Sequence, residues 1–316
     1  MPALEPIIPM KTLLVIAGPT AVGKTETALE IAEFLHAEIL SCDSRQMYRE
    51  MRIGTAVPSR EDLDRVPHHF IGHLSISDYY NVSHYEQEAL QFLNEYFQTH
   101  DVAVVTGGSG LYLEALCHGI DDFPPADIEL RKQLTLEFKT RGIEWLRYTL
   151  KILDPVHYQQ VDLQNHQRLL KAVEVCFQTG KPYSSFLTRN RPFRPFHLVK
   201  IALQRDMADL TERINTRTES MMQAGFLEEV RRLYPFRHLN ALKTVGYKEL
   251  FDYLDGLVSL EYAVEKIKIH TRRYAKRQIT WLKRDPEFQW IHPDHLSQHL
   301  PDSLSRMASS LNPVKQ

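Results

Sequence analysis

The sequence predicts an α/β fold, a P-loop-type parallel sheet core flanked by helices, with a helical insertion subdomain. First, an aliphatic strand runs directly into a glycine-rich turn and a helix. Second, further apolar strands alternate with helical segments, which is typical of a parallel sheet covered on both faces. Third, the strand signal disappears in the middle of the chain. The 316 residues suffice for two domains, or for one domain with a large insertion.

The elements are predicted from apolar spacing, taken in chain order. The first strand covers residues 12–17, and apolar positions at helical spacing follow from residue 24 to about 35. Further strands are expected at 38–42, 102–106 and 198–203, and helices at 128–140, 143–153, 167–177, 207–222 and much of 260–284. The tail after Pro301 is expected to be a loose helix or disordered. We therefore assign residues 1–120 and 197–316 to the core with its C-terminal basic helices, and 121–196 to the insertion.

Composition excludes several classes of protein. With 43% hydrophobic and 25% charged residues, the chain is neither disordered nor fibrous. No apolar run approaches the roughly 20 residues that span a bilayer, and the first ten residues lack a signal-peptide pattern. Cys42, Cys117 and Cys176 lie too far apart to form a zinc or disulfide pattern, so we expect buried reduced thiols. We expect a cytoplasmic, monomeric protein.

The net charge of −2 conceals an asymmetry along the chain. Residues 1–174 carry 15 Lys/Arg and 25 Asp/Glu, whereas residues 175–316 carry 23 and 15. The basic part contains two runs without any acidic residue, 175–205 and 266–284, and the second includes Tyr274 and Trp281. Basic and aromatic side chains together suit phosphate contacts and base stacking, although either run alone is most often a solvated surface.

A phosphate-binding motif connects the first strand to the first helix. Its pattern is G-x-x-x-x-G-K-T, formed by Gly18, Pro19, Thr20, Ala21, Val22, Gly23, Lys24 and Thr25. The glycines let backbone N–H groups turn toward an anion, the helix N-terminus adds positive potential, and Lys24 adds a charge. The Thr25 hydroxyl can ligate Mg²⁺, the one cofactor we expect. The motif predicts a diphosphate or triphosphate ligand without identifying it as ATP.

A carboxylate follows the second predicted strand. Nucleotide hydrolases hold Mg²⁺ with an Asp at the end of an aliphatic strand, but strand 102–106 ends in Gly107 and Gly108, which disfavours hydrolysis. Asp43 instead begins a polar segment with Ser44, Arg45 and Gln46. These residues suit binding of a heterocycle and acceptance of its proton, but Asp43 could equally cap the next helix.

With this phosphate loop, D-S-x-Q-x-Y resembles the tRNA dimethylallyltransferases, also called tRNA isopentenyltransferases. Further blocks of that family match over residues 12–284. They are Ile53-Gly54-Thr55-Ala56 with Pro58, Pro67-His68-His69, Gly107-Gly108-Ser109-Gly110-Leu111-Tyr112, Val245-Gly246-Tyr247-Lys248-Glu249 and Ala275-Lys276-Arg277-Gln278-Ile279-Thr280-Trp281. Ser109 stands where the family usually has Thr, Val57 replaces a frequent Lys, and Lys171 replaces an Arg.

The resemblance implies transfer of a dimethylallyl group from its diphosphate to N6 of the adenosine 3′ of the tRNA anticodon. It implies catalytic roles for Asp43, Arg217 and Ser109, and the insertion would close over the anticodon arm. The implied tRNA contacts are Asp43, Ser44, Arg45, Gln46, Ser109, Arg131, Gln167, Arg168, Lys171, Lys243, Gly246, Tyr247, Lys248, Lys276, Arg277, Gln278 and Trp281.

Other functions compatible with the phosphate loop remain open. One is a P-loop kinase of a nucleoside or small metabolite, with Arg213 and Arg217 as lid arginines. Another is transfer of the same group to free AMP, ADP or ATP, and a third is a nucleotide-dependent RNA-binding switch. The basic helix disfavours the first two, and the missing strand-end Asp disfavours the third.

Overall fold

The structure is a computed structural model that describes residues 11–188 and 191–298, so the predicted tail after Pro301 lies outside the described residues. The chain divides into two compact units. The first comprises residues up to Cys117 and from Arg194 onward, and the second comprises His118–Phe193. The predicted insertion, 121–196, starts and ends three residues later than the second unit. No helix among the described residues is long and apolar enough to cross a membrane.

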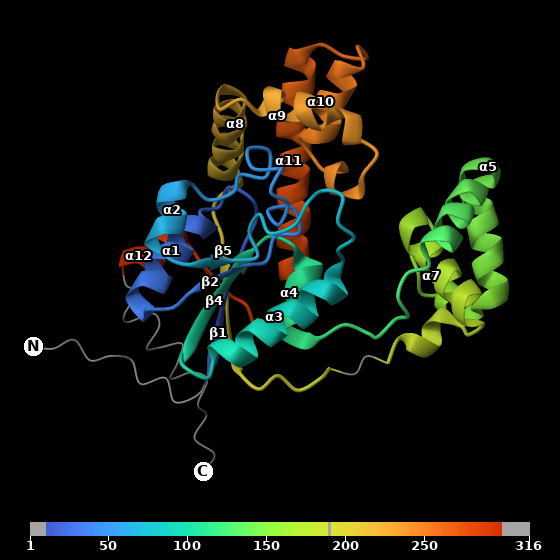
Figure 1. Ribbon diagram of the computed structural model, residues 1–316, viewed down its shortest axis with the longest axis horizontal. Coiled ribbons are helices and arrows are strands. Elements are labelled where there is room, and N and C mark those ends of the chain that lie inside the picture. The colour runs from blue at the N-terminus through green and yellow to red at the C-terminus, as the bar shows by residue number, and fades with distance from the viewer. Residues whose placement is uncertain (1–10, 189–190, 299–316) are drawn as a thin grey trace, which may run out of the picture. The chain divides into compact units, whose positions relative to one another are not determined.

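A parallel sheet forms the centre of the first unit (Figure 1). The strand order is β3-β2-β4-β1-β5-β6, and every neighbouring pair among these described strands is parallel. The strands are β1 (Thr12–Ala17), β2 (Ile39–Ser41), β3 (His68–His69), β4 (Val102–Gly107), β5 (His197–Leu203) and β6 (Gln289–Ile291). Since β1 is central, the loop after it emerges between the ends of β4 and β5.

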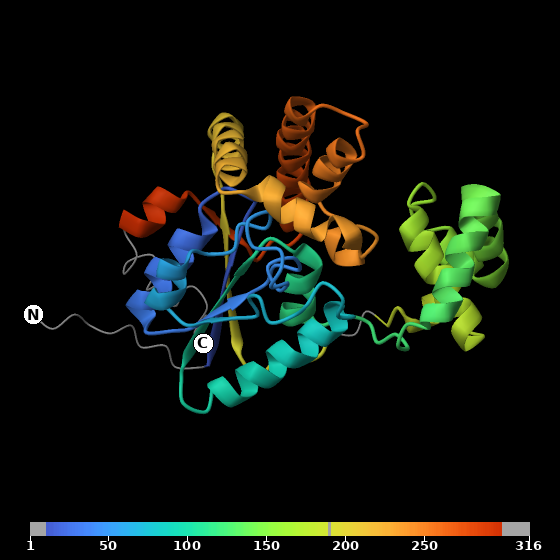
Figure 2. The same ribbon diagram turned by 45° about the horizontal axis from the view of Figure 1, so that its top comes forward.

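Alternating side chains of the strands supply two apolar cores. Leu14 and Ile16 face helices α1 (Lys24–Leu35) and α8 (Met207–Gln223), with α12 (Pro293–Gln298) on the same side. Leu13 and Val15 face the opposite side, which α3 (Val82–Tyr96) and α4 (Gly110–His118) cover (Figures 1 and 2). Burial on both faces explains why β1 reads as a continuous aliphatic run.

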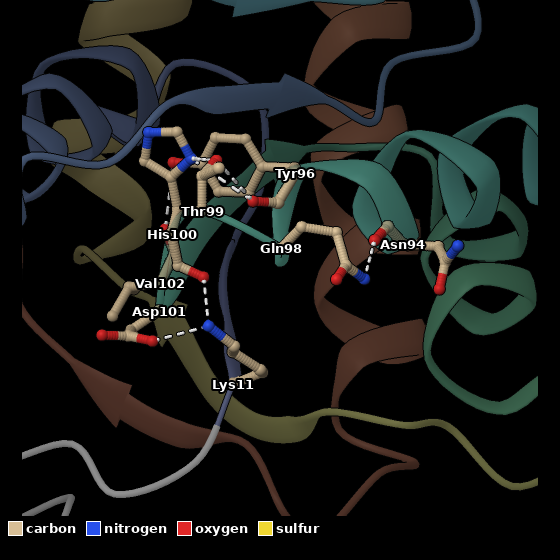
Figure 3. A network of polar contacts seen from close by, with 8 residues as sticks. All are labelled: Lys11, Asn94, Tyr96, Gln98, Thr99, His100, Asp101 and Val102. Atoms are coloured by element: carbon tan, nitrogen blue, oxygen red, sulfur yellow. Dashed lines mark hydrogen bonds and ion pairs between the residues drawn. The ribbon is translucent and has the colours of Figure 1, made fainter.

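A polar network secures the amino ends of the strands (Figure 3). The Tyr96 hydroxyl accepts from the backbone N–H of Glu38 at 3.0 Å and donates to the Val102 carbonyl at 3.1 Å. Lys11 donates to the His100 carbonyl and pairs with Asp101 at 2.7 Å. Because Tyr96 joins the segments that lead into β2 and β4, it helps to fix the relative position of those strands.

A third apolar cluster lies among the C-terminal helices of the first unit. It joins α9 (Phe226–Leu233), α10 (Tyr247–Leu254) and α11 (Leu260–Leu282) to loop residues Tyr48, Met51 and Ile76. Two 3₁₀ turns, η2 (Tyr234–Phe236) and η3 (Asn240–Leu242), connect α9 to α10. The short helix α2 (Arg60–Arg65) begins with a capping box between Ser59 and Asp62.

The second unit has its own apolar core. Leu134, Leu146 and Leu150 of α5 (Ile128–Leu153) pack against Leu169 and Val173 of α7 (His166–Thr179). The unit also contains α6 (Pro155–Tyr158) and η1 (Tyr183–Phe186). The element α5 is interrupted at Gly142, where φ is 74°, so the two predicted helices are separate on either side of that residue.

Most predicted elements occur with small shifts of their limits, whereas several other elements were not predicted. The predicted strand 38–42 is one residue longer at each end than β2. The helix predicted to cover much of 260–284 ends at Leu282. The helices α2, α3, α4, α6, α9, α10 and α12 and the strands β3 and β6 were missed. As predicted, Cys42, Cys117 and Cys176 are buried free thiols within the described residues.

The core of the second unit can be tested with two leucines of α5. Leu146 is fully buried, whereas the Leu136 side chain is exposed. Leu146→Ala is expected to lower the free energy of unfolding by about 2–5 kcal/mol, because it removes buried methyl groups and leaves a cavity. Leu136→Ala, the control, should change that free energy by about 0.5 kcal/mol or less. Urea denaturation followed by circular dichroism measures both, and equal losses would contradict the described packing.

Candidate active site

The phosphate loop lies between the end of β1 and the start of α1. Gly23 precedes the helix with φ 113°, a left-handed conformation that residues with a side chain rarely adopt. Lys24 is the first helical residue, and its ammonium donates to the Pro19 carbonyl at 3.0 Å. The loop borders a cavity of about 870 Å³, which Lys24 and Thr25 also line. This volume lies within the range of small-molecule sites.

Two arginines of α8 reach the phosphate loop. Arg217 donates to the Thr20 hydroxyl at 3.1 Å, and Arg213 donates to the Ala21 carbonyl at 2.8 Å. Their separation by four residues places both on one helical face. Arg217 lines the cavity beside Lys24 and Asp43, so three of the predicted site residues come together here.

Charges in this cavity affect one another strongly. Burial, and to a smaller extent the Arg217 guanidinium, lower the pKa of Lys24, and the Asp43 carboxylate partly opposes them, with a net pKa of about 8. Burial also lowers the pKa of Arg217, again opposed by Asp43. Lys24 and Arg217 are therefore held close together in a desolvated site. A polyanion that entered the site would reduce the repulsion between them.

Asp43 follows β2, where the chain turns rather than starting a helix. One carboxylate oxygen, Oδ1, accepts from the backbone N–H of Arg45 at 2.9 Å and of Gln46 at 3.4 Å. This turn decides against the helix-cap alternative. Oδ2 makes no hydrogen bond with the residues that the structure describes, and Asp43 lines the cavity. It could accept a proton there.

The end of β4 closes against the end of β2. A Cβ on Gly107 would lie 2.1 Å from the Cys42 carbonyl oxygen, so the backbone approach requires glycine. Ser109 then accepts from the backbone N–H of Ser44 at 2.9 Å and donates to its hydroxyl at 3.1 Å. Ser109 thus holds the segment that carries Asp43.

Three hollows of the first unit follow one another. The cavity of about 870 Å³ and a smaller one of about 130 Å³ share the residues Thr20, Ala21, Asp43, Thr55, Arg217 and Tyr274. The small cavity shares Thr244, Val245 and Tyr274 with a groove of about 770 Å³ on α10 and α11. Asp43 and Arg217 therefore lie between the phosphate loop and this groove.

The groove is basic. Its lining cations are Lys243, Lys248, Lys266, Arg273 and Arg277. Lys266 lies over the Tyr262 ring at 4.9 Å and Arg277 over the Tyr274 ring at 5.8 Å. By contrast, Lys268 of the same helix pairs with Glu219 at 2.7 Å. Cations that have no acidic partner within residues 11–188 and 191–298, next to aromatic rings, suit a nucleic-acid strand.

The comparisons identify the family. The protein-family model described as IPP transferase matches residues 46–285. The tRNA dimethylallyltransferase 1 of Bacteroides fragilis is 51% identical over 284 residues, which are 90% of this chain and 94% of that protein. The chain belongs to the IPP transferase family. This confirms the resemblance found in the sequence motifs.

Solved structures agree with this assignment of the IPP transferase fold. A full-length tRNA isopentenylpyrophosphate transferase from Bacillus halodurans is similar, with a TM-score of 0.70 and 32% identity over 95% of this chain and 97% of that one. A eukaryotic dimethylallyltransferase acting on tRNA matches with a TM-score of 0.80 at 24% identity, over 97% of this chain and 81% of that one, which supports the fold. The predicted α/β fold class is confirmed.

Three residues that we predicted to contact tRNA make close contacts within the protein. Tyr247 is fully buried, and its hydroxyl donates to Glu229 at 2.7 Å. Gln278 is also buried; it accepts from the Thr20 N–H and donates to the Gly108 carbonyl, both at 2.8 Å. The Trp281 ring packs so closely on Gly110 that a Cβ there would lie 2.4 Å from it. These side chains support the site from within.

Other predicted contacts form hydrogen bonds within the protein or lie on the surface. Arg45 donates to the Asn240 and Ala241 carbonyls at 3.2 and 3.1 Å, and the Gly246 N–H donates to Glu249 at 2.7 Å. The predicted contacts with exposed side chains in the first unit are Lys243, Lys248, Lys276 and Arg277. Sequence reasoning did not select Lys266 and Arg273 individually, although the basic run contained both.

In the second unit, the predicted contacts gather at α5 and α7. Arg131 forms two hydrogen bonds with the buried Glu174, at 2.6 and 2.8 Å, and Lys171 lies 3.6 Å from the same carboxylate. Gln167 and Arg168 are exposed in the first turn of α7. Glu174 neutralises part of the positive charge of Arg131 and Lys171. Arg168, which is exposed, is therefore the cation of this set most accessible to a ligand.

The residues at the phosphate loop fit a hard divalent cation. Thr25 is exposed to the cavity, and Glu26, Asp62, Asp209 and Glu212 also line it, so the available donors are oxygens. Among the described residues, however, no three carboxylate or histidine groups converge at the loop. A cation here would need ligands from a bound polyphosphate as well as from Thr25.

The electrostatics of Lys24 give a prediction that requires no substrate. An NMR titration of the Lys24 side chain is expected to show a pKa near 8. Arg217→Ala should raise that pKa because it removes a neighbouring positive charge, and Asp43→Asn should lower it because it removes a negative one. If both variants shifted the pKa in the same direction, the described arrangement of the three charges would be wrong.

Proposed function

We propose that this protein is a tRNA dimethylallyltransferase that transfers the dimethylallyl group of dimethylallyl diphosphate to N6 of the adenosine 3′ of the anticodon, with release of diphosphate. One observation carries the proposal: Asp43 and Arg217 lie where the phosphate-loop cavity meets the hollow that leads to the basic groove. This arrangement would place a diphosphate and an RNA base on opposite sides of the reacting atoms. We further propose that it acts as a monomer in the cytoplasm.

The reaction forms one bond and breaks another. N6 of adenine attacks C1 of the allyl group, the C1–O bond to the diphosphate breaks, and N6 loses a proton. The lone pair of N6 is delocalised into the ring, so a base that accepts this proton strengthens the nucleophile. Asp43 is the proposed base, since Oδ2 is available while Oδ1 keeps the carboxylate in its turn.

The leaving diphosphate gains negative charge as the C1–O bond breaks. Donors fixed in advance around that charge lower the barrier most. We propose that the loop from Gly18 to Thr25, Lys24 and Arg217 supply them, with Arg217 exchanging its contact with Thr20 for one with the diphosphate. Mg²⁺, held through Thr25 and the diphosphate, would add charge neutralisation at the same oxygens. Ser109 would keep the Asp43 segment in place.

The groove on α10 and α11 is the proposed site of the anticodon stem-loop in the first unit. The target base would leave its stack and enter the small cavity, where Thr244, Val245 and Tyr274 form the passage from the groove. In the second unit, Gln167, Arg168, Arg131 and Lys171 are the proposed RNA contacts. We propose this unit as the insertion subdomain.

A transfer assay tests the function directly. Wild-type protein with Mg²⁺, dimethylallyl diphosphate and unmodified tRNA is expected to produce N6-dimethylallyladenosine, detected by mass spectrometry after digestion. Asp43→Asn should lower kcat by about 10²–10⁴-fold, because no base then accepts the N6 proton. Its affinity for tRNA should stay near that of the wild type. Prenylation of free AMP instead of tRNA, or phosphate transfer from ATP, would refute the proposal.

The groove gives a second prediction, on tRNA affinity. Arg273→Gln and Lys266→Gln are each expected to weaken tRNA binding and to reduce the slope of log K against log salt by about 1, since each removes one phosphate contact. Lys268→Gln is the matched control on α11, because its ammonium already pairs with Glu219. Filter binding at several salt concentrations measures the slopes. Equal effects in all three variants would place the RNA elsewhere.

A further inference from the structure

The segment that follows Arg52 borders the reacting centre without a role in the proposed chemistry. It contains the block Ile53-Gly54-Thr55-Ala56, which the sequence comparison singled out. Thr55 lines both the large and the small cavity, and Ala56 lines the large one. Ala56 has φ 49°, a left-handed conformation that a residue with a Cβ adopts only when its surroundings impose it.

A buried carboxylate of α9 holds this segment. Glu229 Oε2 accepts from the backbone N–H groups of Arg52 at 3.0 Å and Ile53 at 2.8 Å, and Oε1 accepts from that of Gly54 at 2.9 Å. The Tyr247 hydroxyl donates to Oε1 at 2.7 Å. Glu229 is only 2% exposed. Four donors meet the two oxygens, so a carboxylate, which is purely an acceptor, matches them all.

Residues 52–56 in turn hold Gln46, which lies three residues after Asp43. The Gln46 side chain donates from Nε2 to the carbonyls of Thr55 at 3.2 Å and Ala56 at 3.0 Å. The backbone N–H of Gln46 donates to Asp43 Oδ1 at 3.4 Å. A continuous set of hydrogen bonds therefore runs from Glu229 through residues 52–56 and Gln46 to the Asp43 carboxylate.

We propose that Glu229 is a positioning residue for prenyl transfer: it fixes residues 52–56, and through Gln46 it sets the orientation of the Asp43 carboxylate. This inference rests on the proposed function. It also explains two features of the sequence. Gly54 is required because a Cβ there would lie 2.2 Å from the Phe226 ring and 2.6 Å from the Tyr247 ring. Tyr247 is buried because it completes the set of donors around Glu229.

Glu229→Gln tests the proposal, since it replaces one acceptor oxygen with an NH₂ group that faces backbone N–H donors. We expect kcat for tRNA to fall by about ten- to a hundredfold, with the KM values for tRNA and dimethylallyl diphosphate near those of the wild type, because misplacement acts on the chemical step. Glu228→Gln is the matched control; that neighbouring carboxylate is exposed and lies 3.6 Å from Arg231. It should leave kcat unchanged.

A measurement without substrates separates this proposal from the function itself. Hydrogen exchange of the backbone amides of residues 52–54 should be faster in Glu229→Gln than in the wild type. A wild-type protein that prenylates no tRNA would refute the proposed function, whatever the exchange rates. An active wild type together with a folded Glu229→Gln variant of full kcat would refute the positioning role.

Loss of a buried carboxylate can also prevent folding, and a second variant covers that case. Gln46→Ala leaves Glu229 and its donors intact but breaks the link to residues 55 and 56. We expect a melting temperature near that of the wild type and a lower kcat. Combined with Glu229→Gln in a folded double variant, it should add little further loss, since both act through one route. Wild-type kcat in Gln46→Ala would overturn the proposal.

Discussion

The parallel pairing of β1, β4 and β2 is the constraint on which the site depends. Ala17 lies opposite Gly107 in the register of β1 with β4, and Ser41 lies opposite Thr106 in that of β2 with β4. Three strand ends therefore reach the same edge of the sheet, and each continues into a functional segment. The phosphate loop follows β1, Asp43 follows β2 and Ser109 follows β4. The close contact of Gly107 with Cys42 leaves little freedom in their spacing.

Around that edge, the protein keeps charges of both signs in a desolvated space. Lys24 and Arg217 repel each other, and Asp43 offsets part of that repulsion. The Pro19 carbonyl accepts from the Lys24 ammonium at 3.0 Å, and the Thr20 hydroxyl accepts from Arg217 at 3.1 Å. Gln278 Oε1 accepts from the backbone N–H of Thr20 at 2.8 Å, which holds the loop itself. The unfavourable energy of bringing these charges together is thus compensated when the protein folds. Lys24 and Arg217 are already oriented when a polyanion enters the site.

Local patterns in the sequence were sufficient for the elements with strong periodicity and for the motif at the start. The strand 12–17, the helix from Lys24 and the break near Gly142 all follow from apolar spacing and glycine chemistry. Short elements such as β6 and α9 escaped because their formation depends on neighbours that are distant in sequence. For the same reason, the sequence alone could not show that the side chains of Tyr247 and Trp281 pack within the protein. A motif shows that a residue type is needed, but the fold decides whether the side chain faces a ligand or the interior.

The basic residues of α11 show the difference between composition and packing. Basic residues of α11 divide between two sides of the helix. Lys268 pairs with Glu219, and Arg272 donates to Asn215 and pairs with Glu265. Lys266, Arg273 and Arg277 line the groove instead. A count over residues 266–284 gives every cation equal weight, whereas the partners supplied by α8 and by α11 itself determine which of them remain available for RNA phosphates. The positive surface is therefore a product of packing as much as of composition.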